Sequence, residues 1–531
     1  MEPGMIVDAL GSRIRIDFAA SLDRSQRESL RAAWAGASAR AQTSTKAQTS
    51  TGDDAAELVI SAGIADGPAT ATSPASTERA DVAAADTATL ASALSARVTL
   101  AAIERQRGRL LMLHACGLVT ADGAVLAFVG PSGRGKTTAA RALGSRYGYV
   151  SDETIAVDAS GTVLPYRKPL SVIEPASAAA TDPATGTMTS ADAAVRPKRQ
   201  LAPSALGLLP LPDASLRLGG IILLDRRPGA GDPRVEEVPL AEAIAAIVPE
   251  ASYFAELPRP LRYLATLIER SGGVRRVVYG EADHLAAAVP ELLTAHSEPE
   301  GWEPVDLDAR TGLDARTDLE AAEGYRRGAA LDAIAVGPEL LVLSDGVVHV
   351  LSGIGPQLWL RAGSGASETR LLASVVELHG LPPHGDAAEA VSEAIARLLA
   401  VGLLEALGPA DGSTDAPASR WRRAEHVAAV DSGDRVVVLD LADPASATPQ
   451  ALAGSAAAIW RAIGTDADGT GGRDTEAIVA HVAGSYAVEP AAVRADVEAF
   501  LRELRARALV REIDTDAREL DDTITSGGAD A

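Results

Sequence analysis

Cysteine and long apolar runs are nearly absent from this sequence of 531 residues. Cys116 is its single cysteine, so the chain can form no internal disulfide and no thiolate metal cluster, and a reducing compartment is expected. The opening MEPGMIVDALGSRIRIDF lacks a basic stretch followed by an apolar core, and no run approaches the roughly 18–20 apolar residues of a membrane span. These absences predict a soluble cytoplasmic protein with no membrane partner.

Positive charge and aromatic residues are also in short supply. The formal net charge is −23, which repels nucleic acids at long range and disfavours a nucleic-acid reader. Aromatic residues make up 3% of the chain, so its cores are expected to be mainly aliphatic. A chain of this length exceeds the size at which one core stops growing, and several domains are therefore predicted.

Strand and helix patterns alternate through the first part of the chain, which predicts an α/β domain over residues 1–297. Two stretches within it, 36–85 and 174–200, have little apolar periodicity and are expected to be flexible insertions. A polar, acidic stretch over 298–337 is expected to be a linker.

A weak internal repeat follows, with one copy at 338–408 and another at 423–513. Each copy contains a short hairpin, a helix holding Trp359 or Trp460, and two further helices. Two small α+β domains are predicted, with both tryptophans in their cores. The acidic tail 514–531 is expected to be disordered.

The segment LAFVGPSGRGKTT has the spacing G-x-x-x-x-G-K-T of a phosphate-binding loop, after an apolar strand and before a helix. Its glycines allow successive amides to face one anion, Lys136 places a charge between terminal phosphates, and the Thr137 hydroxyl is a ligand suited to Mg²⁺. The alternative is a glycine-rich turn with an incidental lysine. The motif predicts binding of ATP and Mg²⁺ by Gly130, Pro131, Ser132, Gly133, Arg134, Gly135, Lys136, Thr137 and Thr138.

An acidic pair, Asp152 and Glu153, comes after the next apolar strand, YGYV. One carboxylate could hold Mg²⁺ and one could accept a proton from an attacking hydroxyl, whereas the alternative is a solvated acidic turn. Asp225, at the end of GGIILLD, is a second and weaker candidate for an acid facing Mg²⁺.

The order LHACGLV, VGPSGRGKTTAARAL, YVSDETIAV and VLPYRKPLSV resembles the catalytic core of the HPr kinase/phosphorylase family. In that family a histidine precedes the phosphate loop by one strand and an acidic pair follows it. The resemblance implies a P-loop domain with a mixed sheet, Asp152 as general base and acid, and His114 as a catalytic neighbour of the phosphates. Lys168 could reach a phosphate or lie along the surface. Without the resemblance, a lone histidine in an apolar strand such as His114 is more often a core residue than a catalyst. Glu153 departs from the second aspartate of the true protein kinases.

The two repeats resemble PqqD-like domains, small winged-helix-like modules that capture precursor peptides during peptide modification. The resemblance rests on the short strands, on GPQLWL and AAAIWRAI, and on the apolar ends of the copies. It implies a peptide or protein partner, which an exposed strand edge could bind through main-chain hydrogen bonds. A DNA-binding winged helix is the competing interpretation, but the later helices lack the basic stripe that phosphate contacts require.

Three functions follow from these patterns. The first is an ATP-dependent kinase that transfers phosphate to a Ser or Thr hydroxyl of a peptide or carrier protein in modified-peptide biosynthesis. The second is a nucleotide-dependent protein that delivers a peptide and transfers nothing. The third is a small-metabolite kinase or carboxykinase-like enzyme, because the phosphate cradle also resembles that of ATP-dependent phosphoenolpyruvate carboxykinase.

Overall fold

The computed structural model divides into two compact units, Met1–Leu407 and Gly408–Ala531, which are described separately. No helix in the described part of the chain is both long and apolar enough to cross a membrane. The residues that the structure describes are 4–38, 58–64, 80–131, 135–173, 198–294, 300–307, 324–382, 385–407, 420–424, 426–431, 435–441, 450–463, 473–486 and 488–513.

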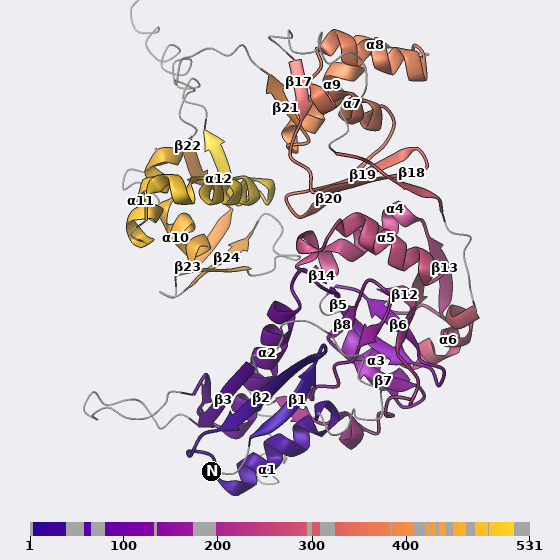
Figure 1. Cartoon of the computed structure of the whole chain (residues 1–531), viewed down its shortest axis with the longest axis vertical. Helices are drawn as coiled ribbons and strands as arrows, with labels where there is room; N and C mark the ends of the chain where they lie inside the picture. Colours follow the sequence, from indigo (N-terminus) through magenta and orange to yellow (C-terminus); the bar gives the residue numbers. More distant parts are fainter. Residues whose placement is uncertain are drawn as a thin grey trace, which may run out of the picture. The chain divides into compact units, whose positions relative to one another are not determined.

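A mixed nine-stranded sheet forms the centre of the first unit, as the α/β prediction requires (Figure 1). Its main path runs in the order β13-β15-β12-β6-β5-β8-β9, and β7 and β14 also pair with β5. The strands β6, β12 and β15 are mutually parallel, while β5 and β13 run antiparallel to their neighbours. The nine strands are β5 (Leu111–Val119), β6 (Ala124–Val129), β7 (Gly148–Ser151), β8 (Thr154–Val157), β9 (Val163–Leu164), β12 (Arg217–Arg226), β13 (Arg234–Val238), β14 (Ala251–Ser252) and β15 (Val274–Tyr279).

Helices cover both faces of this sheet because successive side chains of a buried strand point to opposite sides. In β6, Leu126 and Phe128 pack in the core shared with α3 (Lys136–Gly144) and α6 (Leu285–Thr294). Ala127 and Val129 pack on the other side with α4 (Leu240–Ile247) and α5 (Pro260–Arg270). The continuous apolar run of β6 is thus explained by burial on both faces.

A second sheet, β1-β2-β3-β4, forms the N-terminal part of this unit together with α1 and α2 (Figure 1). The chain enters α1 through a capping box, in which the Asp23 side chain accepts from the backbone of Gln26 and the Gln26 side chain accepts from the backbone of Asp23. The elements are β1 (Met5–Ala9), β2 (Ser12–Phe18), α1 (Arg24–Ala33), β3 (Leu58–Ile64), β4 (Val82–Ala84) and α2 (Thr87–Arg105).

The two expected insertions are partly ordered structure. Within 36–85, β3 and β4 complete the N-terminal sheet, and Ile60 of β3 is buried in its core. At the end of 174–200, β11 (Lys198–Leu201) pairs with β10 (Leu170–Ile173). The expectation of flexibility is therefore wrong for these strands, and residues 39–57, 65–79 and 174–197 lie outside the described part of the chain, as does the tail 514–531.

The two repeats share one order of elements: a strand, a three-stranded meander, three helices and a closing strand that pairs with the first. The first repeat consists of β17 (Gly324–Arg327), β18 (Asp332–Val336), β19 (Glu339–Ser344), β20 (Val347–Leu351), α7 (Gly355–Arg361), α8 (Glu368–His379), α9 (Ala387–Ala400) and β21 (Leu404–Leu407). The second consists of β22 (Arg420–Arg423), β23 (Val427–Asp431), β24 (Arg435–Asp440), β25 (Gln450–Ala453), α10 (Ser455–Ala462), α11 (Thr475–Tyr486), α12 (Pro490–Ala506) and β27 (Val510–Ile513), with the short β26 (Arg473–Asp474) added.

The repeats also agree in detail. The Arg327 guanidinium lies 4.8 Å from the ring centre of Trp359, and that of Arg423 lies 4.9 Å from the ring centre of Trp460. Both tryptophans are fully buried, as the sequence predicts. The first unit ends at Leu407, beside the expected end of the first repeat at 408, and it contains both the α/β part and that repeat.

The described parts of the expected acidic linker 298–337, residues 300–307 and 324–337, are instead built into the first unit. Glu300 accepts a hydrogen bond of 2.7 Å from the first backbone amide of α4, at Leu240. Asp332 accepts one of 3.1 Å from the backbone of Arg262 in α5 and forms an ion pair of 2.9 Å with its guanidinium. Both acids therefore cap helices whose own sequences supply no capping side chain.

A strand from the same stretch, β16 (Trp302–Pro304), pairs with β18 and gives the sheet order β16-β18-β19-β20. Both faces of this sheet are buried. Ile334 and Leu341 pack in the core of α4 and α5, while Ala333 and Leu340 pack in the core of α7, α8 and α9. The first repeat therefore shares its sheet with the α/β core.

Removing the Asp332 carboxylate is expected to destabilise the first unit. Asp332 is 1% exposed, and Asp332→Ala leaves the Arg262 guanidinium without its ion pair, which predicts a loss of about 3 kcal/mol in the free energy of unfolding. Urea unfolding followed by circular dichroism measures it. The control is Glu405→Ala, which removes the exposed ion pair with Arg326 and should cost less than about 1 kcal/mol. Equal effects of the two substitutions would contradict the structural role of Asp332.

A second prediction uses the repeat itself. Ala508 adopts a left-handed conformation with φ of 56°, and Gly402 occupies the matching position with φ of 72°. Since this conformation strains every residue except glycine, Ala508→Gly should stabilise the second unit by about 1 kcal/mol and Gly402→Ala should destabilise the first by a similar amount. Denaturant unfolding measures both, and the same sign for the two changes would show that the positions are not equivalent.

Candidate functional site

The predicted phosphate loop connects β6 to α3 at the carboxyl end of the parallel strands. Gly130 is buried, Pro131 is exposed, and Gly135 begins the helix with φ of 89°, a left-handed conformation that suits glycine. The predicted ligands Ser132, Gly133 and Arg134 lie outside the described residues. The strand before the motif and the helix after it, which the motif requires, are therefore present.

Lys136 is the first residue of α3, and its side chain is turned inward. Its Nζ donates hydrogen bonds to the carbonyl oxygen of Gly130 and, at 3.2 Å, to that of Pro131. Burial lowers the pKa of Lys136, while the nearby Glu250 carboxylate opposes this shift. Thr137 is half-buried beside it and Thr138 is exposed. The lysine thus points into the loop, where a phosphate would lie.

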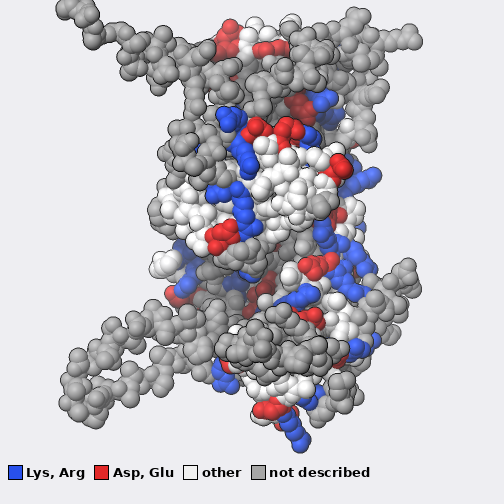
Figure 2. Space-filling view, turned by 90° about the vertical axis from the view of Figure 1, so that its left-hand side faces the viewer, with Lys and Arg blue, Asp and Glu red and all other residues white. Residues whose placement is uncertain are grey.

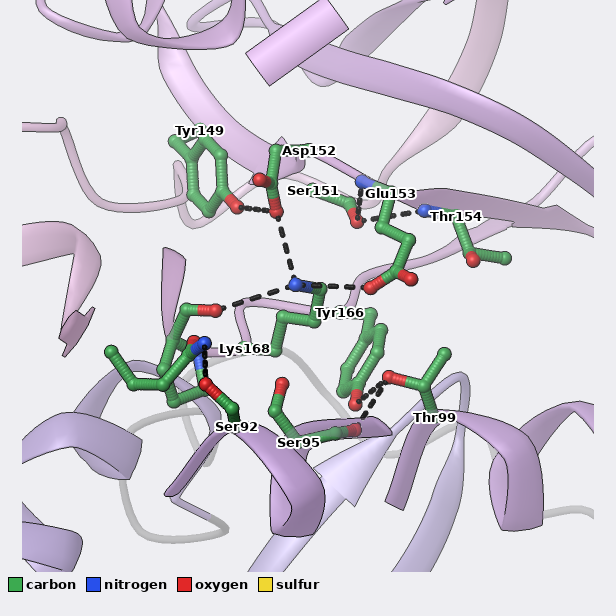
Figure 3. Close-up of polar contacts among 12 residues, drawn as sticks. Ser92, Ser95, Thr99, Tyr149, Ser151, Asp152, Glu153, Thr154, Tyr166 and Lys168 are labelled. Atoms are coloured by element: carbon green, nitrogen blue, oxygen red, sulfur yellow. Dashed lines mark hydrogen bonds and ion pairs between the residues drawn. The ribbon is translucent and has the colours of Figure 1, made fainter. Parts of the chain in front are cut away.

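The acidic pair lies in the turn between β7 and β8 and is held by several contacts (Figure 3). The Tyr149 hydroxyl donates to Asp152 Oδ1 at 3.0 Å. The Ser151 hydroxyl accepts from the backbone amides of Glu153 and Thr154, both at 3.2 Å. Asp152 is 7% exposed, so the alternative of a solvated acidic turn does not describe it.

Lys168 joins the two acids. Its Nζ lies 3.0 Å from Glu153 Oε2 and 3.5 Å from Asp152 Oδ1, as Figure 3 shows. Burial lowers the pKa of Lys168, but the two carboxylates outweigh burial and the net pKa is raised. The expectation that Lys168 could lie along the surface is wrong, because its side chain is 7% exposed. The site therefore contains a buried cation between two candidate metal ligands.

His114 lies on β5, and its Nδ1 is 3.5 Å from Glu250 Oε2. Glu250 ends the short helix η3 (Val248–Glu250), which follows α4. Burial lowers the pKa of His114 and the charge of Lys136 lowers it further, against the opposing charges of Glu250 and Glu153. The backbone amide of Ala115, next to His114, donates to the carbonyl oxygen of Glu153 at 3.1 Å, and Ala115 is paired with Val129, which comes just before the loop. This strand pairing brings the histidine, the acidic pair and the start of the loop together.

Cys116 lies two residues along the same strand and is fully buried. Burial and the charge of Asp152 raise the pKa of its thiol to about 12, so it stays protonated. Asp225 also ends its strand near the loop, since Leu223 of β12 is paired with Val129 of β6. Arg227 donates two hydrogen bonds to Asp225, of 3.0 and 2.7 Å, so this carboxylate already has a cationic partner.

Sequence reasoning did not find Tyr149 or Glu250. Tyr149 is in the same strand motif as the acidic pair, YGYVSDE, and its spacing of three residues before Asp152 was the available signal. Glu250 belongs to an ordinary helix end, and nothing in its local sequence indicates that it contacts His114.

The basic residues of α12 do not form a free stripe. Arg494 donates to Glu476 Oε2 at 2.7 Å, and Arg505 forms an ion pair with Glu512. On the face of the molecule drawn in Figure 2, basic side chains are likewise interspersed with acidic ones.

The comparisons with known proteins concern the second repeat. Residues 436–510, which run from β24 to the start of β27, match the family Coenzyme PQQ synthesis protein D (PqqD). The second repeat contains a PqqD domain. The PqqD match supports the predicted resemblance for this copy, and a PqqD domain suggests a peptide partner. No curated protein matches the chain.

Proposed function

We propose that this chain binds ATP with Mg²⁺ and transfers the terminal phosphoryl group to a hydroxyl of a peptide that its PqqD domain helps to recognise. One observation carries the proposal: β5 is paired with both β6 and β8, so His114, the Asp152–Glu153 turn and the start of the loop that leads to Lys136 meet at the carboxyl end of the parallel strands. This is the edge at which α/β sheets usually bind ligands. The proposal includes the P-loop fold and the kinase activity that the resemblance to the HPr kinase/phosphorylase family implies.

The residues present fit such a ligand. Lys136 and the helix start of α3 provide positive charge where phosphates would lie. Thr137 and one carboxylate of the pair would hold Mg²⁺, which neutralises charge on the phosphates when bound. The described residues contain no group of three or more His, Cys, Asp or Glu side chains suited to a metal, so the remaining ligands would be phosphate oxygens and water.

Asp152 has the contacts expected of a positioned proton acceptor. Its Oδ1 receives the Tyr149 hydroxyl, and burial together with the Asp152 charge raises the pKa of Tyr149, which keeps that hydroxyl protonated. Lys168 supplies a compensating charge at 3.5 Å. In the proposed reaction Asp152 takes the proton of the attacking hydroxyl, while Lys136 stabilises charge on the phosphates.

A non-catalytic, nucleotide-dependent peptide carrier is the second candidate. The observation in its favour is that Lys168 is within 3.5 Å of both acids, so both carboxylates already have a cationic partner. An acid held in this way can serve the fold alone. Turnover of ATP in the presence of peptide separates the two candidates.

Lys136→Ala tests nucleotide binding. Because the Lys136 ammonium is buried and aimed into the loop, its removal should weaken Mg-ATP binding by about tenfold or more while the fold is retained. Isothermal calorimetry gives the dissociation constant, and Arg141→Ala, on the exposed face of the same helix, is the control. Unchanged affinity in folded Lys136→Ala would refute the nucleotide site.

Asp152→Asn tests catalysis. The amide keeps the shape of the side chain but cannot accept the proton, so phosphoryl transfer should fall on the order of a hundredfold to ten-thousandfold, with ATP affinity changed only several-fold. Glu153→Gln should have a milder effect. The measurement is transfer of labelled phosphate from ATP to peptide.

The control is Asp122→Asn, which changes an exposed acid in the turn between β5 and β6. If Asp152→Asn retains the wild-type rate, or wild type turns over no ATP with any peptide, the carrier replaces the kinase as the favoured function.

A further inference from the structure

Three oxygen atoms surround the ammonium group of Lys168, two of which Figure 3 shows on labelled side chains. Its Nζ lies 3.0 Å from Glu153 Oε2 and 3.5 Å from Asp152 Oδ1, and it donates to the carbonyl oxygen of Pro169 at 3.3 Å. Carboxylate and carbonyl oxygens are also the ligands that Mg²⁺ prefers. The ammonium group therefore lies at a point whose surroundings suit a divalent cation.

This group of oxygens is buried on one side and open to solvent on the other. The side chains of Asp152 and Lys168 are 6% and 7% exposed, whereas that of Glu153 is 42% exposed. Ions from solvent can therefore reach the acidic pair from the side of Glu153. The Tyr149 hydroxyl donates to Asp152 but brings no charge, so the positive charge that balances this buried carboxylate comes from Lys168.

The segment that carries Lys168 is held in place by its neighbours. Tyr166 is fully buried, and its hydroxyl shares a hydrogen bond of 2.9 Å with Thr99 of α2, which Figure 3 also shows. Arg167 Nε donates to the carbonyl oxygen of Tyr149 in β7 at 3.1 Å. The position of this segment therefore does not depend on the ion pairs of Lys168, and its side chain can be changed while the backbone stays in place.

The other lysine of the site has a different task. Lys136 Nζ donates to the carbonyl oxygens of Gly130 and Pro131, both in the phosphate loop. The described residues contain no group of three or more His, Cys, Asp or Glu side chains that could hold a metal, so a divalent cation at the acidic pair needs further ligands. Under the proposed function, the phosphate oxygens of ATP supply them.

We propose that Lys168 is a positioning residue that acts as a built-in cation: its ammonium group takes the place of a divalent cation between Asp152 and Glu153, so that Mg²⁺ binds at this pair only together with ATP. The inference rests on the proposed function for its statement about ATP. The chemical class of ion that the pair would otherwise bind is a hard divalent cation with oxygen ligands.

The test is Lys168→Met in the full chain, without nucleotide. Methionine fills a similar apolar space but removes the charge, which leaves two carboxylates and one carbonyl oxygen around the position of the former ammonium group. Mn²⁺ is the probe because it shares the preference of Mg²⁺ for oxygen ligands. The loss of the free Mn²⁺ signal in electron paramagnetic resonance measures binding, and calorimetry gives the dissociation constant.

Three variants are matched controls. Lys168→Arg keeps the positive charge at the pair. Arg141→Met removes one positive charge from the exposed face of α3, so it accounts for the more negative charge of the whole chain. The double variant Lys168→Met/Glu153→Gln removes one of the two charged ligands as well.

We expect Lys168→Met to bind Mn²⁺ about tenfold or more tightly than wild type, because two carboxylates that lack a cation attract one strongly in a partly buried site. Lys168→Arg, Arg141→Met and the double variant should bind Mn²⁺ as weakly as wild type. This gain of metal binding is a result that a merely structural lysine would not produce.

An affinity of Lys168→Met for Mn²⁺ no higher than that of wild type would overturn the inference. An equal gain in Arg141→Met would also overturn it, since total charge would then explain the effect, and so would a gain that persists in the double variant. If Lys168→Met does not fold, Lys168→Gln takes its place, because its amide can still donate hydrogen bonds but carries no charge. If neither variant folds alone, Mn²⁺ should restore the wild-type circular dichroism spectrum, and no recovery would count against the inference.

The outcome is separate from that of the kinase proposal, because Mn²⁺ binding is measured without ATP or peptide. A gain of Mn²⁺ binding in Lys168→Met, with no phosphate transfer by wild type, would uphold the built-in cation and refute the kinase. No gain, with phosphate transfer by wild type, would refute the built-in cation and leave the kinase in place.

Discussion

The buried ion pair between Asp332 and Arg262 is the constraint on which the first unit depends. The carboxylate accepts from the backbone of α5 and lies 2.9 Å from the guanidinium, so neither charge is left alone in the interior. Because Asp332 begins β18, the pair fixes the whole sheet of the first repeat on α4 and α5. The same placement brings β20 against η3, which carries Glu250 to His114. A contact far from the phosphate loop thereby determines what lies beside it.

Local patterns predicted the features whose causes are local. The glycine spacing around Lys136, the apolar strand before it and the tryptophans of the two repeats each depend on residues close together in the sequence. The structural role of the acidic stretch 298–337 depends instead on partners that are distant in the sequence. Glu300 and Asp332 cap helices 60 and 70 positions away, and a composition rich in acids has no local sign of this role. The stretch was therefore predicted to be a linker, although its described residues, 300–307 and 324–337, belong to the fold of the first unit.

The candidate site divides in the same way. Asp152 was a candidate because it follows the phosphate loop by one strand, and His114 because the family resemblance implies it, whereas Glu250 and Tyr149 were not predicted. Lys168 was considered only as a possible phosphate contact, since pairing with both acids follows from how β7, β8 and the segment before β10 meet. The charge balance of a buried site depends on how distant segments pack together. For that reason the sequence did not predict that Lys168 pairs with both carboxylates.

The repeats show which constraints a duplicated fold retains. Each keeps the arginine over a buried tryptophan, and each keeps a left-handed residue before its closing strand, because these features serve the core of every copy. Their sheet edges differ: β16 covers β18 in the first repeat, while no described strand pairs with the outer edge of β23 in the second. Core packing tolerates little change and an edge tolerates much, so a difference in function between the copies is expected at the edges. The first repeat is further constrained because it shares its sheet with the α/β core, whereas the second repeat belongs to a separate unit and has no such constraint in the described residues.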